Sequence, residues 1–352
     1  MKLTKNISRR DVLRLSGTAA GLSFAEAHAV GPQGAAQRPA GSGGSRLPRE
    51  VWTASLCTMD LEAADPAGMV ELVLGTAGQV AAFHPDILCL PETFAYSGLS
   101  GGLPSVAELA ERPPGQVTAA LARLAKEMNC YVICPLYTRD SGRLYNAAVL
   151  LDRGGNVAGE YRKIHPTLGE MESGIAPGPV QPPVFETDFG VIGIQICFDI
   201  NWPEGWRRLK EAGAEIVFWP SAFAGGNRVN TMAWLNRYVV VSSTLKDTSK
   251  ICDISGEVLA ATGRWNPRWA CAAVNLEKAF LHTWPFVRRF EEIKRKYGRK
   301  IRIRSWHEEE ISVIESRSPD LRVEEVMEEF ELVDYDGWIG MAEREQERRR
   351  ML

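Results

Sequence analysis

The chain has 352 residues, 45% of them hydrophobic and 24% charged, with a formal net charge of -3 at pH 7. This balance is typical of a soluble protein with one large or two smaller domains, and it gives no reason to expect nucleic acid or an anionic membrane as a partner. No apolar run predicts a bilayer-spanning helix, and the seven cysteines and five histidines show no spacing typical of a metal site. We therefore expect no metal and no stable membrane anchor.

The N-terminal part of the chain resembles an export signal. Residues 8–14 (SRRDVLR) are similar to the twin-arginine motif, and a mildly apolar stretch follows that ends in Ala27-His28-Ala29, which is typical of a cleavage site. Residues 1–29 are therefore predicted to be a twin-arginine signal peptide that exports the protein to the periplasm or the medium. A basic helix of a cytoplasmic protein is the alternative. Residues 30–49, rich in Gly, Ala, Pro and Gln, are predicted to be a flexible linker.

From residue 50 onward, short apolar strands alternate with amphipathic helices. Turn residues separate two of the strand pairs, which are predicted to be hairpins. This order predicts a mixed α/β sheet in a domain over residues 50–280. Strands are predicted at residues 51–59, 86–90, 131–136, 145–151, 157–161, 191–196, 215–219, 239–244, 249–253 and 257–260, and helices at residues 66–83, 116–128, 203–212 and 228–238.

One cysteine, Cys197, lies where a predicted strand meets a predicted helix. The strand is rich in β-branched residues, Asn201 is the expected N-cap, and Pro203 stands at a first-turn position that needs no N–H. A side chain on such a turn is exposed and faces backbone N–H groups, and the positive end of the helix favours a thiolate. Cys197 is therefore a candidate nucleophile on a strand-to-helix elbow.

Two more reactive side chains, Glu92 and Lys163, each come shortly after an apolar strand. A thiol nucleophile needs a base that later returns the proton, and the tetrahedral oxyanion needs a fixed cation and a backbone N–H. Glu92, Lys163 and the Phe198 N–H are the candidates for these tasks. By spacing alone each side chain also has an ordinary structural interpretation, as a helix cap, a surface lysine or a buried inert cysteine.

These segments resemble the motifs of the nitrilase superfamily, the carbon–nitrogen hydrolases, which work with a Glu-Lys-Cys triad. The resemblance runs from about residue 51 to about residue 275 and includes four non-catalytic phrases. It implies a four-layer α-β-β-α sandwich in which Glu92 is the general base and acid, Lys163 stabilises the oxyanion and Cys197 is the nucleophile, with no cofactor. The four phrases are YNAA at residues 145–148, PSAF at 220–223, NRYVV at 236–240 and GEVLA at 256–260.

Many members of the superfamily have a second glutamate shortly after the lysine. The spacing from Lys163 favours Glu170 over Glu172 as this second glutamate. Both residues are also interpretable as solvated acids of a loop. The sequence Cys-Phe-Asp at the elbow, followed by Trp-Pro-Glu, is closer to amidases and carbamoyl-amide hydrolases than to nitrilases, which commonly have Cys-Trp-Glu. The residues expected to line the substrate pocket are Phe94, Phe198, Ser221 and Phe223.

The predicted function is therefore hydrolysis of a small linear amide or N-carbamoyl compound through a cysteine thioester. The alternatives are a nitrilase, an amine-dependent acyltransferase and a non-catalytic binding protein. Residues 281–352 carry dense charges of both signs, with one strand candidate at 300–305 and a solvated helix end at 343–350. We expect this extension to serve packing or oligomerisation, because members of the superfamily usually form homo-oligomers.

Overall fold

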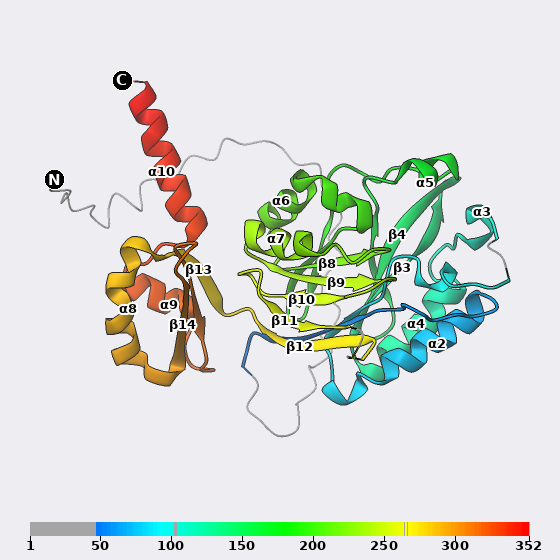
Figure 1. Cartoon of the computed structure of the whole chain (residues 1–352), viewed down its shortest axis with the longest axis horizontal. Coiled ribbons are helices and arrows are strands. Elements are labelled where there is room, and N and C mark those ends of the chain that lie inside the picture. The colour runs from blue at the N-terminus through cyan, green and yellow to red at the C-terminus, as the bar shows by residue number, and fades with distance from the viewer. Residues whose placement is uncertain (1–46, 102–103, 264, 266, 352) are drawn as a thin grey trace. The chain divides into compact units, whose positions relative to one another are not determined.

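Two stacked β-sheets form the centre of the described structure (Figure 1). This computed structural model describes residues 47–101, 104–263, 265 and 267–351, so the predicted signal peptide, residues 1–29, lies outside it. In spatial order, sheet A consists of β12 (Trp269–Asn275), β1 (Glu50–Leu56), β2 (Ile87–Cys89), β3 (Tyr131–Asp140), β4 (Arg143–Leu151) and β5 (Val157–Arg162). Sheet B consists of β11 (Val258–Ala261), β10 (Lys250–Cys252), β9 (Val239–Thr244), β8 (Ile216–Ser221), β7 (Gly190–Ile194) and β6 (Val184–Thr187).

The two sheets share one pairing pattern. In sheet A, β1, β2 and β3 are parallel, and β12, β4 and β5 are antiparallel to their neighbours. In sheet B, β7, β8 and β9 are parallel, and β6, β10 and β11 are antiparallel to theirs. The prediction of a mixed sheet, with hairpins at β4–β5 and β10–β11, is confirmed.

Helices cover the outer face of each sheet. Helices α2 (Pro66–Gly78) and α4 (Gln116–Met128) share a core with sheet A, and α6 (Pro203–Glu211) and α7 (Asn227–Asn236) share one with sheet B. A third core lies between the sheets, because side chains alternate along each strand: Ile87 faces sheet B while Leu88 faces the helices. The predicted four-layer α-β-β-α sandwich is confirmed. The short helices are η1 (Ala81–Phe83), η2 (Phe94–Tyr96), α3 (Val106–Leu109), α5 (Leu168–Glu172) and η3 (Cys197–Asn201).

The segment Pro66–Phe83, with a mean hydropathy of 1.2, meets the length and hydropathy of a membrane-spanning helix, so the prediction that no apolar run is long enough is wrong. In the structure, α2 begins at this segment's proline because the Asp65 side chain accepts from Gly68 N at 2.9 Å. Its residues Met69 and Val73 are buried against sheet A. Burial in the core thus accounts for part of the apolar character of the segment, of which 33% is buried.

The C-terminal part of the chain builds a third sheet with the strand order β13-β15-β14. Phe280 on β13 belongs to the core between the main sheets, whereas Leu281 next to it belongs to a separate core with the C-terminal helices. The strand predicted at 300–305 is observed as β14, but β13, β15 and two helices were not predicted. The elements are β13 (Lys278–His282), α8 (Thr283–Tyr297), η4 (Gly298–Lys300), β14 (Ile301–Trp306), β15 (Ile311–Ser316), α9 (Val323–Glu329) and α10 (Tyr335–Arg350).

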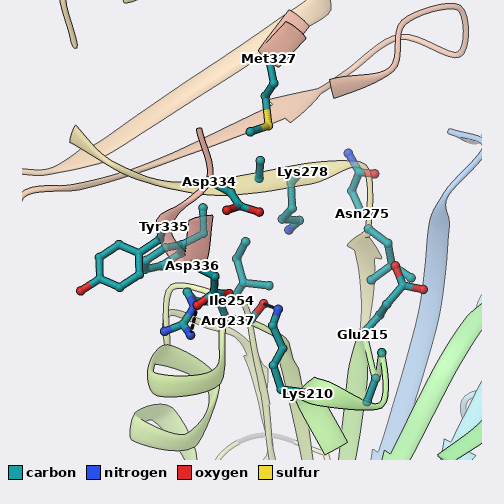
Figure 2. Close-up of a pocket in the computed structure, with 15 residues that line it drawn as sticks. Lys210, Glu215, Arg237, Ile254, Asn275, Lys278, Met327, Asp334, Tyr335 and Asp336 are labelled. Carbon is teal, nitrogen blue, oxygen red and sulfur yellow. Dashed lines mark hydrogen bonds and ion pairs between the residues drawn. The ribbon is translucent and has the colours of Figure 1, made fainter. Parts of the chain in front are cut away.

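A cavity of about 260 Å³ lies where this C-terminal segment meets the α6–β8 side of sheet B (Figure 2). Arg237 forms an ion pair with Asp336 there and lies over the Tyr335 ring, and Lys278 pairs with Asp253 at 2.7 Å. The cavity is lined by both charged and apolar side chains, and its lining includes none of the predicted catalytic residues.

Candidate active site

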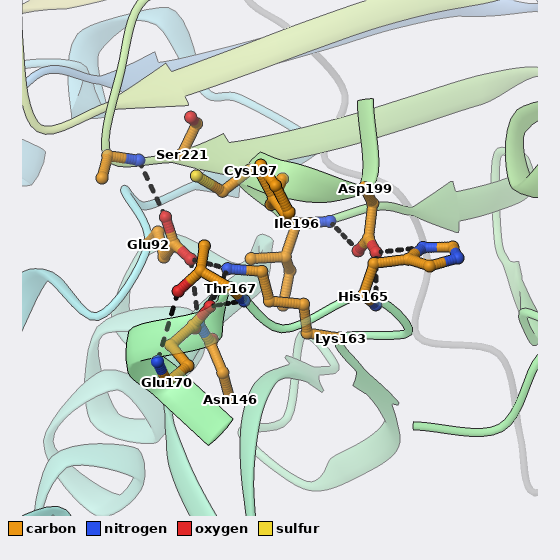
Figure 3. Close-up of polar contacts among 12 residues, drawn as sticks. Glu92, Asn146, Lys163, His165, Thr167, Glu170, Ile196, Cys197, Asp199 and Ser221 are labelled. Atoms are coloured by element: carbon orange, nitrogen blue, oxygen red, sulfur yellow. Dashed lines mark hydrogen bonds and ion pairs between the residues drawn. The ribbon is translucent and has the colours of Figure 1, made fainter. Parts of the chain in front are cut away.

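The ends of several strands bring the predicted reactive side chains to one place (Figure 3). Glu92 follows β2, Lys163 directly follows β5, and Cys197 follows β7. Strands β2 and β5 run in the same direction within sheet A, so Glu92 and Lys163 leave that sheet at the same edge, and β7 of the stacked sheet B supplies Cys197. Side-chain contacts join Glu92, Lys163 and Glu170, and the Cys197 thiol interacts with the Glu92 carboxylate.

The lysine bridges two carboxylates. Lys163 Nζ lies 2.8 Å from Glu92 Oε1 and 2.8 Å from Glu170 Oε2. Lys163 and Glu92 are 1% and 4% exposed, so these charges interact with little solvent screening. Burial opposes the ammonium form, but the charges of Glu92, Cys197 and Glu170 raise the pKa of Lys163 above its ordinary value. The lysine therefore carries a positive charge, as an oxyanion stabiliser requires.

Of the two candidate second glutamates, Glu170 faces the lysine and Glu172 is exposed. Both are on α5, which begins with a capping box: Glu170 N donates to Thr167 Oγ1 at 3.3 Å and Thr167 N donates to Glu170 Oε2 at 2.7 Å. The cap fixes the Glu170 carboxylate against Lys163 Nζ. The geometry therefore places Glu170 next to the predicted triad.

Asn146 on β4 joins the same group of side chains, although it belongs to one of the phrases expected to be non-catalytic. Its Nδ2 donates to Glu92 Oε1 at 2.8 Å and to Glu170 Oε1 at 2.6 Å. The signal in the sequence was an asparagine in the middle of an apolar strand, where an unpaired amide is costly. We refer to Glu92, Asn146, Lys163 and Glu170 as the acid–base network.

The elbow at Cys197 has the sharp strand-to-helix turn that its position predicted, but the prediction of an exposed side chain is wrong, because Cys197 is buried. Cys197 has a positive φ of 45°, which is strained for a residue with a side chain, and it begins the short helix η3. Trp219 Nε1 donates to the Cys197 carbonyl at 3.1 Å and so fixes the turn. Pro203 is the first residue of α6 as predicted, but the N-cap is Trp202, because Asn201 uses its side chain to donate to the Phe198 carbonyl.

The expectation that the helix end favours a thiolate is wrong for Cys197. Burial, the Glu92 charge and a hydrogen bond to Glu92 raise the pKa of this thiol to about 12, although the Lys163 charge opposes the shift. The neighbouring carboxylate and the burial outweigh the field of a helix as short as η3. The resting form is a thiol beside a carboxylate, so ionisation has to be coupled to the attack.

A second polar cluster lies on the other side of Cys197 (Figure 3). Asp199 is fully buried, and its carboxylate accepts from Tyr161 OH at 2.7 Å and from Ile196 N at 2.9 Å. It also accepts from His165 N at 2.8 Å and lies 2.9 Å from His165 Nδ1. We refer to Asp199, Tyr161, His165 and the Ile196 N–H as the elbow brace. It ties the turn before Cys197 to the loop that follows Lys163.

The residues expected to line the pocket divide into two pairs. Phe94 and Ser221 have no exposed surface. Phe94 belongs to the core under α2 and α4. Ser221 Oγ accepts from Phe223 N at 3.1 Å, and this hydrogen bond forms a turn. The turn directs Ala222 N to Glu92 Oε2 at 2.8 Å. Ser221 thus shapes the loop and does not present its side chain to a ligand. Phe198 and Phe223 are partly exposed and stay candidate pocket walls.

The other cysteines differ from Cys197 in their surroundings. Cys130 and Cys134 are fully buried in the outer core of sheet A, as their apolar strand predicted. Burial raises the pKa of Cys130 to about 12. No group of three metal-binding side chains occurs among residues 47–101, 104–263, 265 and 267–351. The chemistry available at the site is that of a thiol, two carboxylates and an ammonium.

The chain is similar to known proteins both in sequence and in fold. A family model described as carbon-nitrogen hydrolase matches residues 53–279. A β-ureidopropionase of Arabidopsis thaliana is 39% identical over 124 residues, which are 34% of this chain and 30% of the relative. An omega-amidase of Xenopus tropicalis is 32% identical over 148 residues, 39% of this chain and 52% of the relative. The chain thus spans about half or less of the length of these relatives.

Among solved structures, an amidase from Nesterenkonia sp. has a TM-score of 0.58 at 20% identity, covering 73% of this chain and all of that chain. Variants of that amidase have been solved in complex with acrylamide and with butyramide, and one structure shows Michael addition of acrylamide at its active-site cysteine. At this level of identity the likeness shows the fold.

Proposed function

Since the chain belongs to the carbon–nitrogen hydrolase family, we propose that it hydrolyses a small linear amide or N-carbamoyl compound through a thioester on Cys197. The observation that carries the proposal is the convergence of a thiol, a carboxylate and a buried ammonium at the strand ends. Glu92 interacts with the thiol and lies 2.8 Å from Lys163 Nζ. This set supplies the nucleophile, the base and the cation that acyl transfer needs.

The first step is attack on the carbonyl carbon. Cys197 Sγ bonds to that carbon while its proton moves to Glu92, because the thiol is protonated at rest. The oxyanion forms beside Lys163 Nζ and the Phe198 N–H, which lies in the first turn of η3, where N–H groups have no acceptor within the helix. Glu92 then gives the proton to the leaving nitrogen, and ammonia or an amine departs.

The second step is hydrolysis of the thioester. Glu92 takes a proton from water, and the hydroxide adds to the thioester carbonyl. The C–S bond then breaks, Glu92 returns the proton to sulfur, and the acid is released. Glu170 keeps Lys163 in place and balances its charge during both steps. No step needs a metal or an organic cofactor.

The substrate class is proposed from the elbow sequence and from the relatives. Phe198 and Phe223, both partly exposed, offer apolar walls of the kind that suits a small acyl group. The names of the relatives include a β-ureidopropionase and an omega-amidase, and the Nesterenkonia amidase was solved with butyramide. Short aliphatic amides and N-carbamoyl amino compounds are therefore the first compounds to test.

The test is a turnover screen of the exported form across aliphatic amides, N-carbamoyl amino compounds and nitriles, with Cys197→Ala as the control. We expect ammonia release from an amide or carbamoyl compound and none in the variant. Undiminished release by Cys197→Ala would refute the mechanism. Turnover of nitriles alone would make the protein a nitrilase, and transfer to an added amine in preference to water would make it an acyltransferase.

Export and assembly are proposed from the sequence alone. Residues 1–29 carry the twin-arginine pattern, and cell fractionation of an Arg9→Lys, Arg10→Lys variant tests it; unchanged localisation would contradict export. We also propose a homo-oligomer. Light scattering of the purified chain tests this, and an active monomer would contradict it.

A further inference from the structure

One residue of β4, Asn146, contacts the other three members of the acid–base network. Its Nδ2 donates to Glu92 Oε1 at 2.8 Å and to Glu170 Oε1 at 2.6 Å. Its main-chain oxygen accepts from the Lys163 N–H at 2.8 Å. A side-chain amide has two N–H hydrogens, and this one directs both of them at carboxylates.

The surroundings of Asn146 determine which way its amide points. The residue is 1% exposed, and its Oδ1 is buried with no hydrogen-bond partner in the described part of the chain. Turning the amide over would place Oδ1 against two carboxylate oxygens and leave Nδ2 without an acceptor, which is less favourable. The residue therefore leaves its acceptor unsatisfied and donates twice. Native cores contain few such unsatisfied atoms, and a functional site is one explanation for them.

The two oxygens of Glu92 differ in the donors that they face. Oε1 accepts from Asn146 Nδ2 and from Lys163 Nζ, each at 2.8 Å, which occupies both of its lone pairs. Oε2 accepts from Ala222 N at 2.8 Å, and the described residues supply no second N–H donor to it. A proton that moves to Glu92 therefore binds Oε2, because Oε1 would first have to release a donor.

We infer that Asn146 is a positioning residue that makes Glu92 Oε2 the proton-accepting atom and keeps Glu170 ionised beside Lys163. This inference rests on the proposed hydrolysis by Cys197. In the attack, the S–H bond breaks, an O–H bond forms at Oε2 and sulfur bonds to the carbonyl carbon. The same proton then passes from Oε2 to the leaving nitrogen as the C–N bond breaks.

The charge balance of the network explains why the amide matters. Two carboxylates share the single ammonium of Lys163, so the group carries one excess negative charge in a buried site. Burial by itself would raise the pKa of Glu170, but the Lys163 charge and the hydrogen bonds from Asn146 and Thr167 hold that pKa below its ordinary value. Without the amide, the ionised carboxylates lose donors and bind protons more readily.

The test compares Asn146→Ala and the isosteric Asn146→Asp with the full-length wild type. We expect kcat to fall about tenfold to a hundredfold, the effect of losing a hydrogen bond to a charged group, with a smaller change in KM. The acidic limb of the pH profile of kcat/KM should move to higher pH by about one unit in the alanine variant and further in the aspartate variant, because a third carboxylate adds repulsion.

Asn275 offers a matched control. It is also a buried strand asparagine, and its Nδ2 donates to Glu315 Oε1 at 3.0 Å and to Ser316 O at 2.7 Å, outside the acid–base network. Asn275→Ala should lower Tm without moving the acidic limb. If the limb of Asn146→Ala superimposes on that of the wild type, Asn146 is only structural and the inference is overturned.

A second measurement separates this inference from the proposed function. Alkylation of Cys197 by iodoacetamide, followed at that cysteine by mass spectrometry across pH, needs no substrate. The alkylation rate should have an acidic limb, and the Asn146 variants should shift that limb as they shift the acidic limb of turnover. A wild type that hydrolyses no amide would refute the proposed function, while the alkylation profile would still decide the role of Asn146.

Discussion

The two polar clusters on either side of Cys197 differ in how they hold negative charge. The acid–base network places two carboxylates around one ammonium, so its groups are charged and a proton is able to move among them. The elbow brace surrounds one carboxylate, Asp199, with the Tyr161 hydroxyl and the main-chain N–H groups of Ile196 and His165. An acceptor saturated by neutral donors holds its position and its charge. We therefore propose that the first cluster carries out the chemistry and that the second positions the nucleophile.

The largest effect should come from removing the charge that balances the acid–base network. In Lys163→Met, two buried carboxylates face each other without a cation, which costs about 3–5 kcal/mol of folding free energy. We expect a loss of activity of at least about a thousandfold, because the oxyanion also loses its cation. Thermal unfolding and turnover of the preferred amide measure the two effects. A Lys163→Met variant with wild-type Tm would contradict the charge balance described here.

The next effect should come from Asp199→Asn, which breaks the brace without changing its shape. Four contacts converge on the Asp199 carboxylate, but an asparagine has one acceptor oxygen there and points its NH2 group at other donors. We therefore expect the free energy of unfolding to fall by about 1–3 kcal/mol. Activity should fall because the elbow moves, whereas the acidic limb of the pH profile should stay in place. A shift of that limb would show that Asp199 takes part in the proton transfer.

Glu170→Gln should lower kcat about tenfold, since the glutamine keeps the shape but removes a charge that orients Lys163. Glu172→Gln, on the exposed side of the same helix, is the matched control and should have no effect. The pKa of Glu170 is lowered in the folded protein, so its contribution to stability is present above the unfolded pKa and is lost as the pH falls. The difference in Tm between wild type and Glu170→Gln should therefore shrink as the pH is lowered.

The smallest effect should come from His165→Phe. The ring stacks on Trp202 at 3.9 Å between centroids, and its Nδ1 lies 2.9 Å from Asp199. The phenylalanine keeps the stacking surface, and the main-chain N–H of residue 165 still donates to Asp199. We expect a loss of activity of about threefold or less, which corresponds to the free energy of one weak hydrogen bond. A hundredfold loss, measured by turnover, would move His165 into the chemistry.

Much of the fold was predictable because its strands and helices are locally consistent. The helix predicted at residues 116–128 is α4 with the same bounds, and the strand predicted at 239–244 is β9. The family that the triad motifs indicated is confirmed by the match over residues 53–279. The third sheet was missed because its strands are short and lie in a highly charged segment, where only β14 shows clear alternation.

The site was predictable where one residue type at one position suffices, and not where the role depends on tertiary packing. The strand-to-helix turn at Cys197 was predicted from its local sequence and is observed. The role of Asn146 was not predicted, because it depends on the register of β4 beside β5, which brings Lys163 N to the Asn146 carbonyl. The protonation state of the thiol was also missed, since it is set by burial and, after burial, by the charge of Glu92, which is remote in the sequence. Phe94 was assigned to the pocket although it packs in the core, because its direction after β2 is not encoded locally.

The pairing of β12 with β1 has a consequence for how the protein is made. Val274 pairs with Val51, more than two hundred residues earlier in the chain, so sheet A gains its last strand only after residues 269–275 have left the ribosome. Until then the edge of β1 is unpaired and able to recruit strands from other nascent chains. Premature termination before residue 269 should therefore yield an insoluble product, and synthesis that slows just upstream of β12 should need the help of chaperones.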